Sequence, residues 1–245
     1  MAALASLSRL KALGLSGTRI EGQLSRKIWA RAFRTWRVST WPTPTLLVIQ
    51  LPAGQLSPKL KALNLENCPL IVDASTVHLA RLTSLQGLVL RKTGFEKQSI
   101  TGAGLARLTP LSQLQHLNLS ATRVNDTTIA PLTKLTNLRS LDLGLTGLGN
   151  AGMAQLAKLP RLESLTVIYQ VGFGGTNVTA DGLHPLAGHK TLANPDLTGT
   201  KIGDADLPKF KAVAGLKQLT ISGTAVTAAG AKQLATQLPG CRIIR

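Results

Sequence analysis

The chain has 245 residues, of which 44% are hydrophobic and 3% aromatic, and its formal net charge at pH 7 is +17. This composition indicates a globular protein whose core is built mainly from leucine. The absence of a long uninterrupted apolar run excludes a membrane-spanning helix, and the two cysteines, Cys68 and Cys241, exclude a disulfide framework.

The first segment, residues 1–20, contains no acid and could be mistaken for a targeting peptide. Its leucines nevertheless match a template that recurs throughout the chain. The matching positions are Leu10, Leu13, Leu15, Thr18 and Ile20. We therefore interpret the segment as repeat sequence, recognise no signal peptide, and expect a cytoplasmic protein.

Residues 21–56 depart from the template, although Leu10 and Leu60 are separated by 50 residues, or about two repeat periods. Three interpretations remain open for this irregular stretch. It is a frameshifted or degenerate repeat, a loop insertion, or a cationic amphipathic helix within residues 22–41. The last interpretation rests on Trp29, Phe33 and Trp36, which recur at helical spacing among basic residues and would suit a membrane surface or an acidic groove.

From residue 57 to the C-terminus, the template Leu-x-x-Leu-x-Leu-x-x-Thr-x-(Ile/Val) returns about every 24 residues. Its copies begin at Leu60, Leu85, Leu114, Leu138, Leu162, Leu192 and Leu216, with a last partial copy at Gly240. A fixed period of this length predicts a stacked solenoid, in which each repeat needs neighbours to bury its leucines. We expect residues 1–245 to form one such domain.

Each part of the template predicts one element of a coil. The Leu-x-Leu core predicts a short strand, and the following threonine can bond the backbone of the turn that leaves it. The phrases ITGAGL from Ile100, VTADGL from Val178 and VTAAGA from Val226 then place a threonine where a helix N-cap is expected. Apolar residues spaced three apart, such as Met153, Leu156 and Leu159, predict a short α or 3-10 helix on the outer face.

This combination resembles the leucine-rich repeat proteins, and in particular the cysteine-containing or bacterial type of repeat that also occurs in the arrays of F-box proteins. The resemblance covers residues 1–20 and 57–245. It implies an α/β solenoid, or horseshoe, with parallel strands on the concave face and short helices on the convex face. It also implies a role in protein recognition.

Catalytic and cofactor-binding motifs are missing from the sequence. None of the four histidines pairs with cysteine or a carboxylate at metal-ligand spacing, and VGFGGT from Val171 lacks the lysine of a phosphate-binding loop. We therefore expect no enzyme, no cofactor and no metal. Nucleic-acid binding is disfavoured, because Arg107, Lys134 and Lys158 suggest solvated charge spread over outer helices.

Two sets of residues are candidates for partner binding. On the concave strands, Asn118 and Asp142 could form a polar cluster with His116, although a surface hydrogen-bond ladder is the simpler explanation and the one we favour. Larger anchors are the second set, since recognition usually depends on a few big side chains in a desolvated centre. They are Arg91, Lys92, Phe95, Ile168, Tyr169 and Phe173.

The second set surrounds two repeats that are longer than the others, at about residues 94–98 and 170–175. Both insertions lie between strand and helix, so we expect them on the same rim, about 14 Å apart. Loops on a rigid scaffold are frequent binding sites.

The sequence thus predicts a monomeric, non-catalytic scaffold that binds a protein partner of unknown identity through its concave face and rim loops. Two alternatives remain. One is the substrate-recognition part of an F-box-type ubiquitin ligase adaptor. The other is a basic membrane-surface or nucleic-acid binder that uses residues 22–41.

Overall fold

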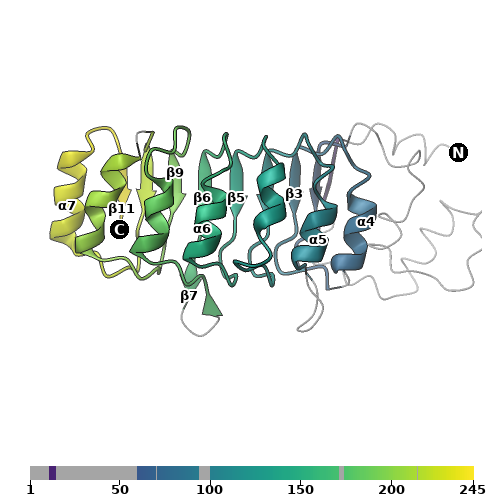
Figure 1. Cartoon of the computed structure of the whole chain (residues 1–245), viewed down its shortest axis with the longest axis horizontal. Coiled ribbons are helices and arrows are strands. Elements are labelled where there is room, and N and C mark those ends of the chain that lie inside the picture. Colours follow the sequence, from purple (N-terminus) through teal and green to yellow (C-terminus); the bar gives the residue numbers. More distant parts are fainter. Residues whose placement is uncertain (1–10, 15–59, 70, 94–99, 171–173, 214) are drawn as a thin grey trace, which may run out of the picture.

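The computed structural model describes residues 11–14, 60–69, 71–93, 100–170, 174–213 and 215–245. Within them, a nine-stranded parallel sheet covers one side of an elongated solenoid, and short helices cover the other (Figure 1). The strands follow in the order β1 (Ala12–Gly14), β2 (Ala62–Asn64), β3 (Gly87–Val89), β4 (His116–Asn118), β5 (Ser140–Asp142), β6 (Ser164–Thr166), β9 (Asn194–Asp196), β10 (Gln218–Thr220) and β11 (Arg242–Ile244).

The helices alternate with the strands and are all short. They are η1 (Asp73–Ser75) and α4 (Thr76–Leu79) in one coil, then α5 (Gly102–Arg107), η2 (Ala130–Lys134), α6 (Asn150–Leu156), η3 (Ala180–Leu186), η4 (Asp204–Ala212) and α7 (Ala228–Gln237). The predicted mixture of α and 3-10 segments on the outer face is confirmed.

The register of the sheet follows the leucine template. Each strand has three residues, and most strands are centred on the second leucine of their repeat, so that Leu117 lies beside Leu141 and Leu141 beside Leu165. These leucines are almost completely buried between sheet and helices. Pro195 and Ile243 take the place of the second leucine in β9 and β11. The strand is shifted from the predicted Leu-x-Leu core by one residue, because the third leucine, such as Leu119, already lies beyond the last strand residue.

The threonine of the template has the predicted role in the turn that follows the strand. Its hydroxyl donates a hydrogen bond to the carbonyl three residues earlier, as Thr122 does to Leu119 at 2.5 Å and Thr200 to Leu197 at 2.6 Å. The residue just before the threonine has a positive φ, for example 54° at Ala121 and 71° at Gly199. The bond therefore closes a tight left-handed turn and satisfies a buried carbonyl.

The strand β1 pairs directly with β2, through Leu13 and Leu63, in the same parallel arrangement as the other neighbours. In the sheet, β2 is therefore the direct neighbour of β1, although about two repeat periods separate Leu10 from Leu60 in the sequence. The irregular stretch at 21–56, with the predicted amphipathic helix at 22–41, lies outside the described residues.

The helices begin in two different ways. In four coils the first free N–H groups are bonded by a side chain of the preceding coil. Thus Thr101 donates its N–H to Asp73 at 2.7 Å, and Gly149 and Gly152 donate theirs to Asp126 at 2.6 and 3.0 Å. Asn150 and Asp204 bond Thr179 and Thr227 in the same manner.

Each neighbour-capped helix carries a glycine three residues after its N-cap, because the capping side chain occupies the space of a Cβ. A Cβ atom at Gly104 would lie 2.2 Å from an oxygen of Asp73, and the same contact would be 2.1 Å between Gly230 and Asp204. The three threonines predicted as N-caps occupy the N-cap positions of their helices. Only Thr227 caps its own helix, by accepting the N–H of Gly230 at 3.0 Å.

Three other coils stabilise their helix starts internally. Here the glycine is replaced by a residue whose oxygen accepts the N–H three residues earlier. Ser75 and Asp206 bond the N-cap residues Val72 and Gly203 in this way, and Thr128 bonds Asn125 in the turn before η2. The coils of Thr128 and Asp206 follow Gly102 and Ala180, which have no side-chain oxygen to offer. A glycine three residues after the N-cap thus marks the coils whose helix start depends on the neighbouring coil.

Candidate functional site

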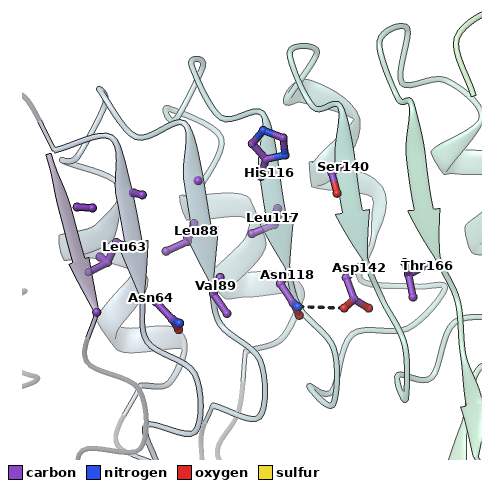
Figure 2. Close-up of a pocket in the computed structure, with 14 residues that line it drawn as sticks. Leu63, Asn64, Leu88, Val89, His116, Leu117, Asn118, Ser140, Asp142 and Thr166 are labelled. Carbon is purple, nitrogen blue, oxygen red and sulfur yellow. Dashed lines mark hydrogen bonds between the residues drawn. The ribbon is translucent and has the colours of Figure 1, made fainter. Parts of the chain in front are cut away.

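An open hollow of about 440 Å³ lies on the concave side of strands β1 to β6 (Figure 2). Its floor is made of small or apolar residues, including Ala62, Gly87 and Val89. The surface is hollow there because these side chains are short. Polar side chains from the neighbouring strands border this floor. They are Asn64, His116, Asn118, Ser140, Asp142 and Thr166.

The floor residues Ala62 and Gly87 were not among the sequence-derived site candidates. A usable signal was present, because residues two apart in a strand point to the same face. Ala62 therefore shares the face of Asn64, and Gly87 that of Val89. Most of the candidates from the sequence were large side chains, whereas the hollow results from small ones.

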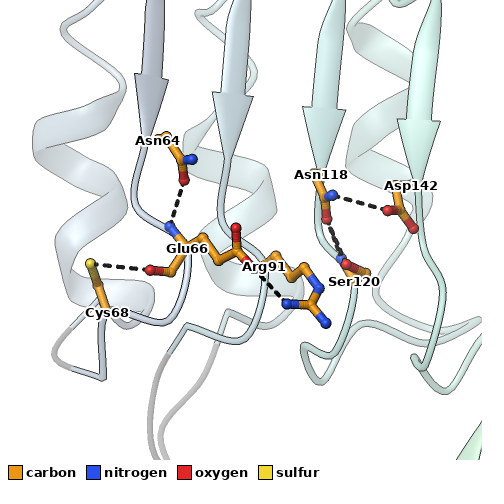
Figure 3. Close-up of polar contacts among 7 residues, drawn as sticks. All are labelled: Asn64, Glu66, Cys68, Arg91, Asn118, Ser120 and Asp142. Atoms are coloured by element: carbon orange, nitrogen blue, oxygen red, sulfur yellow. Dashed lines mark hydrogen bonds and ion pairs between the residues drawn. The ribbon is translucent and has the colours of Figure 1, made fainter. Parts of the chain in front are cut away.

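The predicted pair of Asn118 and Asp142 is in contact at one end of the hollow. The amide of Asn118 donates to a carboxylate oxygen of Asp142 at 2.9 Å, and its own oxygen accepts the N–H and hydroxyl of Ser120 at 2.9 and 2.7 Å (Figure 3). His116 lies at the other end of strand β4 (Figure 2). The polar cluster consequently contains Ser120 in place of the predicted His116.

Much of this polarity serves the local backbone. Asn64, Asn118, Asp142 and Asp196 each accept the N–H of the residue two positions later, at 2.9 to 3.0 Å. This is the hydrogen-bond ladder that was the simpler explanation in the sequence. Each bond occupies one side-chain oxygen, and Asp142 keeps its second oxygen on the side of Asn118 and the hollow.

Burial raises the pKa of Asp142 above its ordinary value of 3.8. The N–H of Gly144, the charge of Arg91 and the amide of Asn118 oppose this effect, and the charge of Asp196 adds to it. Desolvation dominates, so the carboxylate loses solvation that a partner's hydrogen-bond donor or cation could replace.

Arg91 lies at the edge of the same surface, where its guanidinium pairs with Glu66 at 2.5 Å (Figure 3). The side chains of Arg91 and Glu66 retain 42% and 31% exposure. An exposed pair of this kind stabilises the fold by well under about 1 kcal/mol. Arg91 is thus already matched to an acid within the protein.

Of the remaining large candidates, Lys92, Ile168 and Tyr169 lie just beyond the ends of strands β3 and β6. Lys92 is exposed in the left-handed turn, with a φ of 51°, and the other two are half-buried. Phe95 and Phe173 lie outside the described residues. The structure therefore brings Asn118 and Asp142 together on the concave face and leaves Arg91, Lys92 and Tyr169 at its border.

The second insertion includes a small antiparallel hairpin of β7 (Tyr169–Gln170) and β8 (Gly174–Gly175). It precedes the buried threonine of its coil, Thr176, which bonds the carbonyl of Val167 at 3.3 Å. The first insertion instead follows its buried threonine, Thr93, and ends before buried Ile100. The two insertions thus enter the same strand-to-helix connection at different points, which the repeat lengths alone did not reveal.

Among the residues that the structure describes, no group of three or more His, Cys, Asp or Glu side chains is placed to hold a metal ion. Cys68 lies in the coil of β2 and Cys241 precedes β11, toward opposite ends of the sheet, as the sequence predicted. In the described ranges, no helix combines the length and the apolar character needed to cross a bilayer.

Comparison with known proteins supports the fold. The chain is similar to the crystal structure of internalin C2 from Listeria monocytogenes, with a TM-score of 0.62 and 20% identity, over 99% of this chain and 83% of that one. The protein has the leucine-rich repeat fold. No family model and no curated protein matches its sequence. Leucine-rich repeat solenoids commonly serve as scaffolds for protein recognition, since their stacked coils present extended concave surfaces.

Proposed function

We propose that this leucine-rich repeat protein is a non-catalytic scaffold that binds a protein partner in the hollow over strands β1 to β6. The observation that carries the proposal is the hollow itself, which combines an apolar floor with bordering polar groups. This is the usual composition of a site that buries an apolar side chain and fixes its orientation by a few hydrogen bonds.

Two groups of residues in the hollow would contact the partner in different ways. The floor formed by Val89, Gly87 and Ala62 would accept an apolar side chain of the partner. Asn118 and Asp142 would bond its polar or cationic groups, because burial has already weakened the hydration of the Asp142 carboxylate. A polypeptide segment that crosses the strands would reach both groups of residues.

The border residues would extend this contact. Arg91 and Lys92 follow strand β3, and Ile168 and Tyr169 follow strand β6, on the side of the hollow that carries Asn118 and Asp142. Tyr169 is well supported, since its N–H bonds the carbonyl of Thr198 at 3.0 Å and its strand pairs with Gly175. The insertion residues Phe95 and Phe173 remain predicted contacts.

The proposal is tested by affinity capture with the full chain, followed by identification and purification of the retained protein. Val89→Arg and Asp142→Ala should each reduce the affinity of that protein by about tenfold or more, as expected for a central contact. Tyr169→Ala measures the contribution of the border.

Lys134→Ala and Lys232→Ala on the convex side are the matched controls, and the thermal stability of every variant is compared with that of the wild type. Equal affinity across the concave and convex variants would reject the hollow as the contact surface. Loss of the retained material on nuclease treatment would reject a direct protein contact.

The other predictions concern the setting of this scaffold. A single domain over 1–245, a monomeric state and a cytoplasmic location all remain our proposals. Of the two alternative functions, the F-box-type adaptor would need an additional segment that recruits the ligase. The membrane-surface or nucleic-acid binder would depend on residues 22–41, and its binding would be lost when that stretch is deleted.

A further inference from the structure

Exposed cations line one edge of the solenoid, where each helix ends and the next strand begins. We call it the basic edge. It includes Lys61, Arg81, Arg107, Lys134, Arg139, Lys158, Arg161, Lys190 and Lys217. In the sequence, Arg107, Lys134 and Lys158 suggested charge spread over outer helices, but the stacking of coils places them along one edge. Arg81, Lys134 and Lys158, for example, each precede the buried leucine that follows their helix.

The basic edge has little internal counter-charge. In the described connections from helix to strand, Glu163 is the one acid, and it pairs with Arg139. The other recorded partners of these cations are neutral. Arg161 donates to the amide oxygen of Asn137 at 2.6 Å, and Lys158 to that of Gln155 at 3.0 Å.

The acids of the helices are gathered at the opposite edge, where the helices start. Asp73, Asp126 and Asp204 cap the next coil there, and Asp206 caps its own. Because these acids cap helix starts, negative charge is concentrated at that edge. The basic edge therefore has an excess of positive charge over most of the described solenoid.

The shape of the basic edge restricts its ligand. Lys61 precedes β2 and Lys217 precedes β10, and six strand-to-strand steps separate them along the sheet, or about 29 Å. In the described connections from helix to strand, the edge has no Phe, Trp or Tyr for base stacking, and Val77 is the exposed large hydrophobic residue of the described chain. A line of point charges without apolar anchors suits a polymer of phosphates better than unstacked bases or a lipid surface.

We propose that the basic edge binds the phosphate backbone of duplex nucleic acid without sequence preference. This inference goes beyond the proposed function and rests on a different surface. Binding of this kind is driven by the release of counterions from the duplex, and its affinity therefore falls steeply as salt is added.

The test is fluorescence anisotropy of a short labelled DNA duplex of arbitrary sequence, titrated with the full chain at several salt concentrations. The key variant is Arg81→Gln/Lys134→Gln/Lys158→Gln. Its slope of log affinity against log salt should be shallower than that of the wild type by about 0.9 for each lost contact, or about 2.7 for all three.

The matched control is Arg123→Gln/Lys201→Gln/Lys232→Gln, which removes the same charges from exposed positions away from the basic edge. Its slope should change by less than about 1, the equivalent of one contact. Equal changes in both variants would overturn the proposal, because net charge alone would then explain the binding.

Absence of duplex binding by the wild type would also overturn it, as would tighter binding to vesicles of anionic lipid than to the duplex. None of these results bears on the hollow, since Val89→Arg leaves the basic edge intact. Failure of this inference is therefore distinguishable from failure of the proposed protein scaffold.

Discussion

Short polar side chains recur in two regions of the solenoid and form bonds of different range. On the concave strands, Asn64, Asn118, Asp142 and Asp196 bond the backbone two residues later, within their own coil. At the helix starts, the bonds of Asp73, Asp126, Asn150 and Asp204 span 23 to 29 residues and join one coil to the next.

The difference separates residues that hold the stack together from residues that are available for recognition. Loss of a helix-start bond affects two coils, because the capped helix and the capping side chain belong to neighbours. Loss of a concave bond to the backbone affects one turn, although Asn118 also bonds Asp142 of the next coil. Concave positions can therefore change without disturbing the stack, which suits a surface that must adapt to a partner.

The largest effect is expected for a leucine that lies between these two regions. Leu141 is 1% exposed and packs between Leu117 and Leu165, so Leu141→Ala should reduce the free energy of unfolding by about 2–5 kcal/mol. Urea denaturation measures it. Thr166→Ala on the neighbouring concave strand is the control, and a comparable loss there would contradict the assigned faces.

A slightly smaller effect is expected at the glycine of a neighbour-capped helix. Gly104→Ala should cost about 1–3 kcal/mol, because its new Cβ would overlap the Asp73 oxygen that bonds Thr101. In the double variant with Asp73→Ala the added cost of the methyl should nearly vanish, since the obstructing oxygen is gone. Additive losses in this double-mutant cycle would mean that the glycine has another role.

The two regions can be compared directly by removing one aspartate from each. Asp126→Ala leaves the N–H groups of Gly149 and Gly152 without their cap and should cost about 1–2 kcal/mol. Asp142→Ala should cost less than about 1 kcal/mol, because Asp142 bonds a single backbone N–H, that of Gly144, and its removal also ends the desolvation of the carboxylate. If the two losses in thermal or urea denaturation are equal, the distinction between stack and surface fails.

The smallest effects should appear in the pH dependence of unfolding, with opposite signs. The pKa of Asp204 is lowered by its bonds to Thr227, so its contribution exists above the unfolded pKa and is lost as pH falls through the folded one. The pKa of Asp142 is raised by burial, so its contribution exists below the unfolded pKa and is lost as pH rises through the folded one.

Chemical denaturation of Asp204→Asn and Asp142→Asn between about pH 2 and 7 measures both effects. The Asp204→Asn variant should lose stability relative to the wild type mainly at the upper end of this range. The Asp142→Asn variant should gain relative to the wild type as pH rises. Parallel curves for the two variants would show that the carboxylates do not differ in their surroundings.

The sequence predicted the solenoid well because its information is local and repeated. Burial of the template leucines, the turn-closing threonines and the short outer helices all follow from a period of about 24 residues and the alternation of a strand. The candidate site was predictable in part. Asn118 and Asp142 meet as predicted, whereas His116 lies away from them and Arg91 is paired with Glu66.

What the sequence determined by itself is the identity of each position within a coil, because strand, turn and helix are encoded by neighbouring residues. What only the tertiary structure decided is what one coil does to the next. The capping of Gly149 by Asp126, the hollow left by Ala62 and Gly87, and the alignment of Arg81 with Lys158 all join residues of different coils. They arise when the coils stack at the spacing of hydrogen-bonded strands, and no local pattern specifies which side chains then meet.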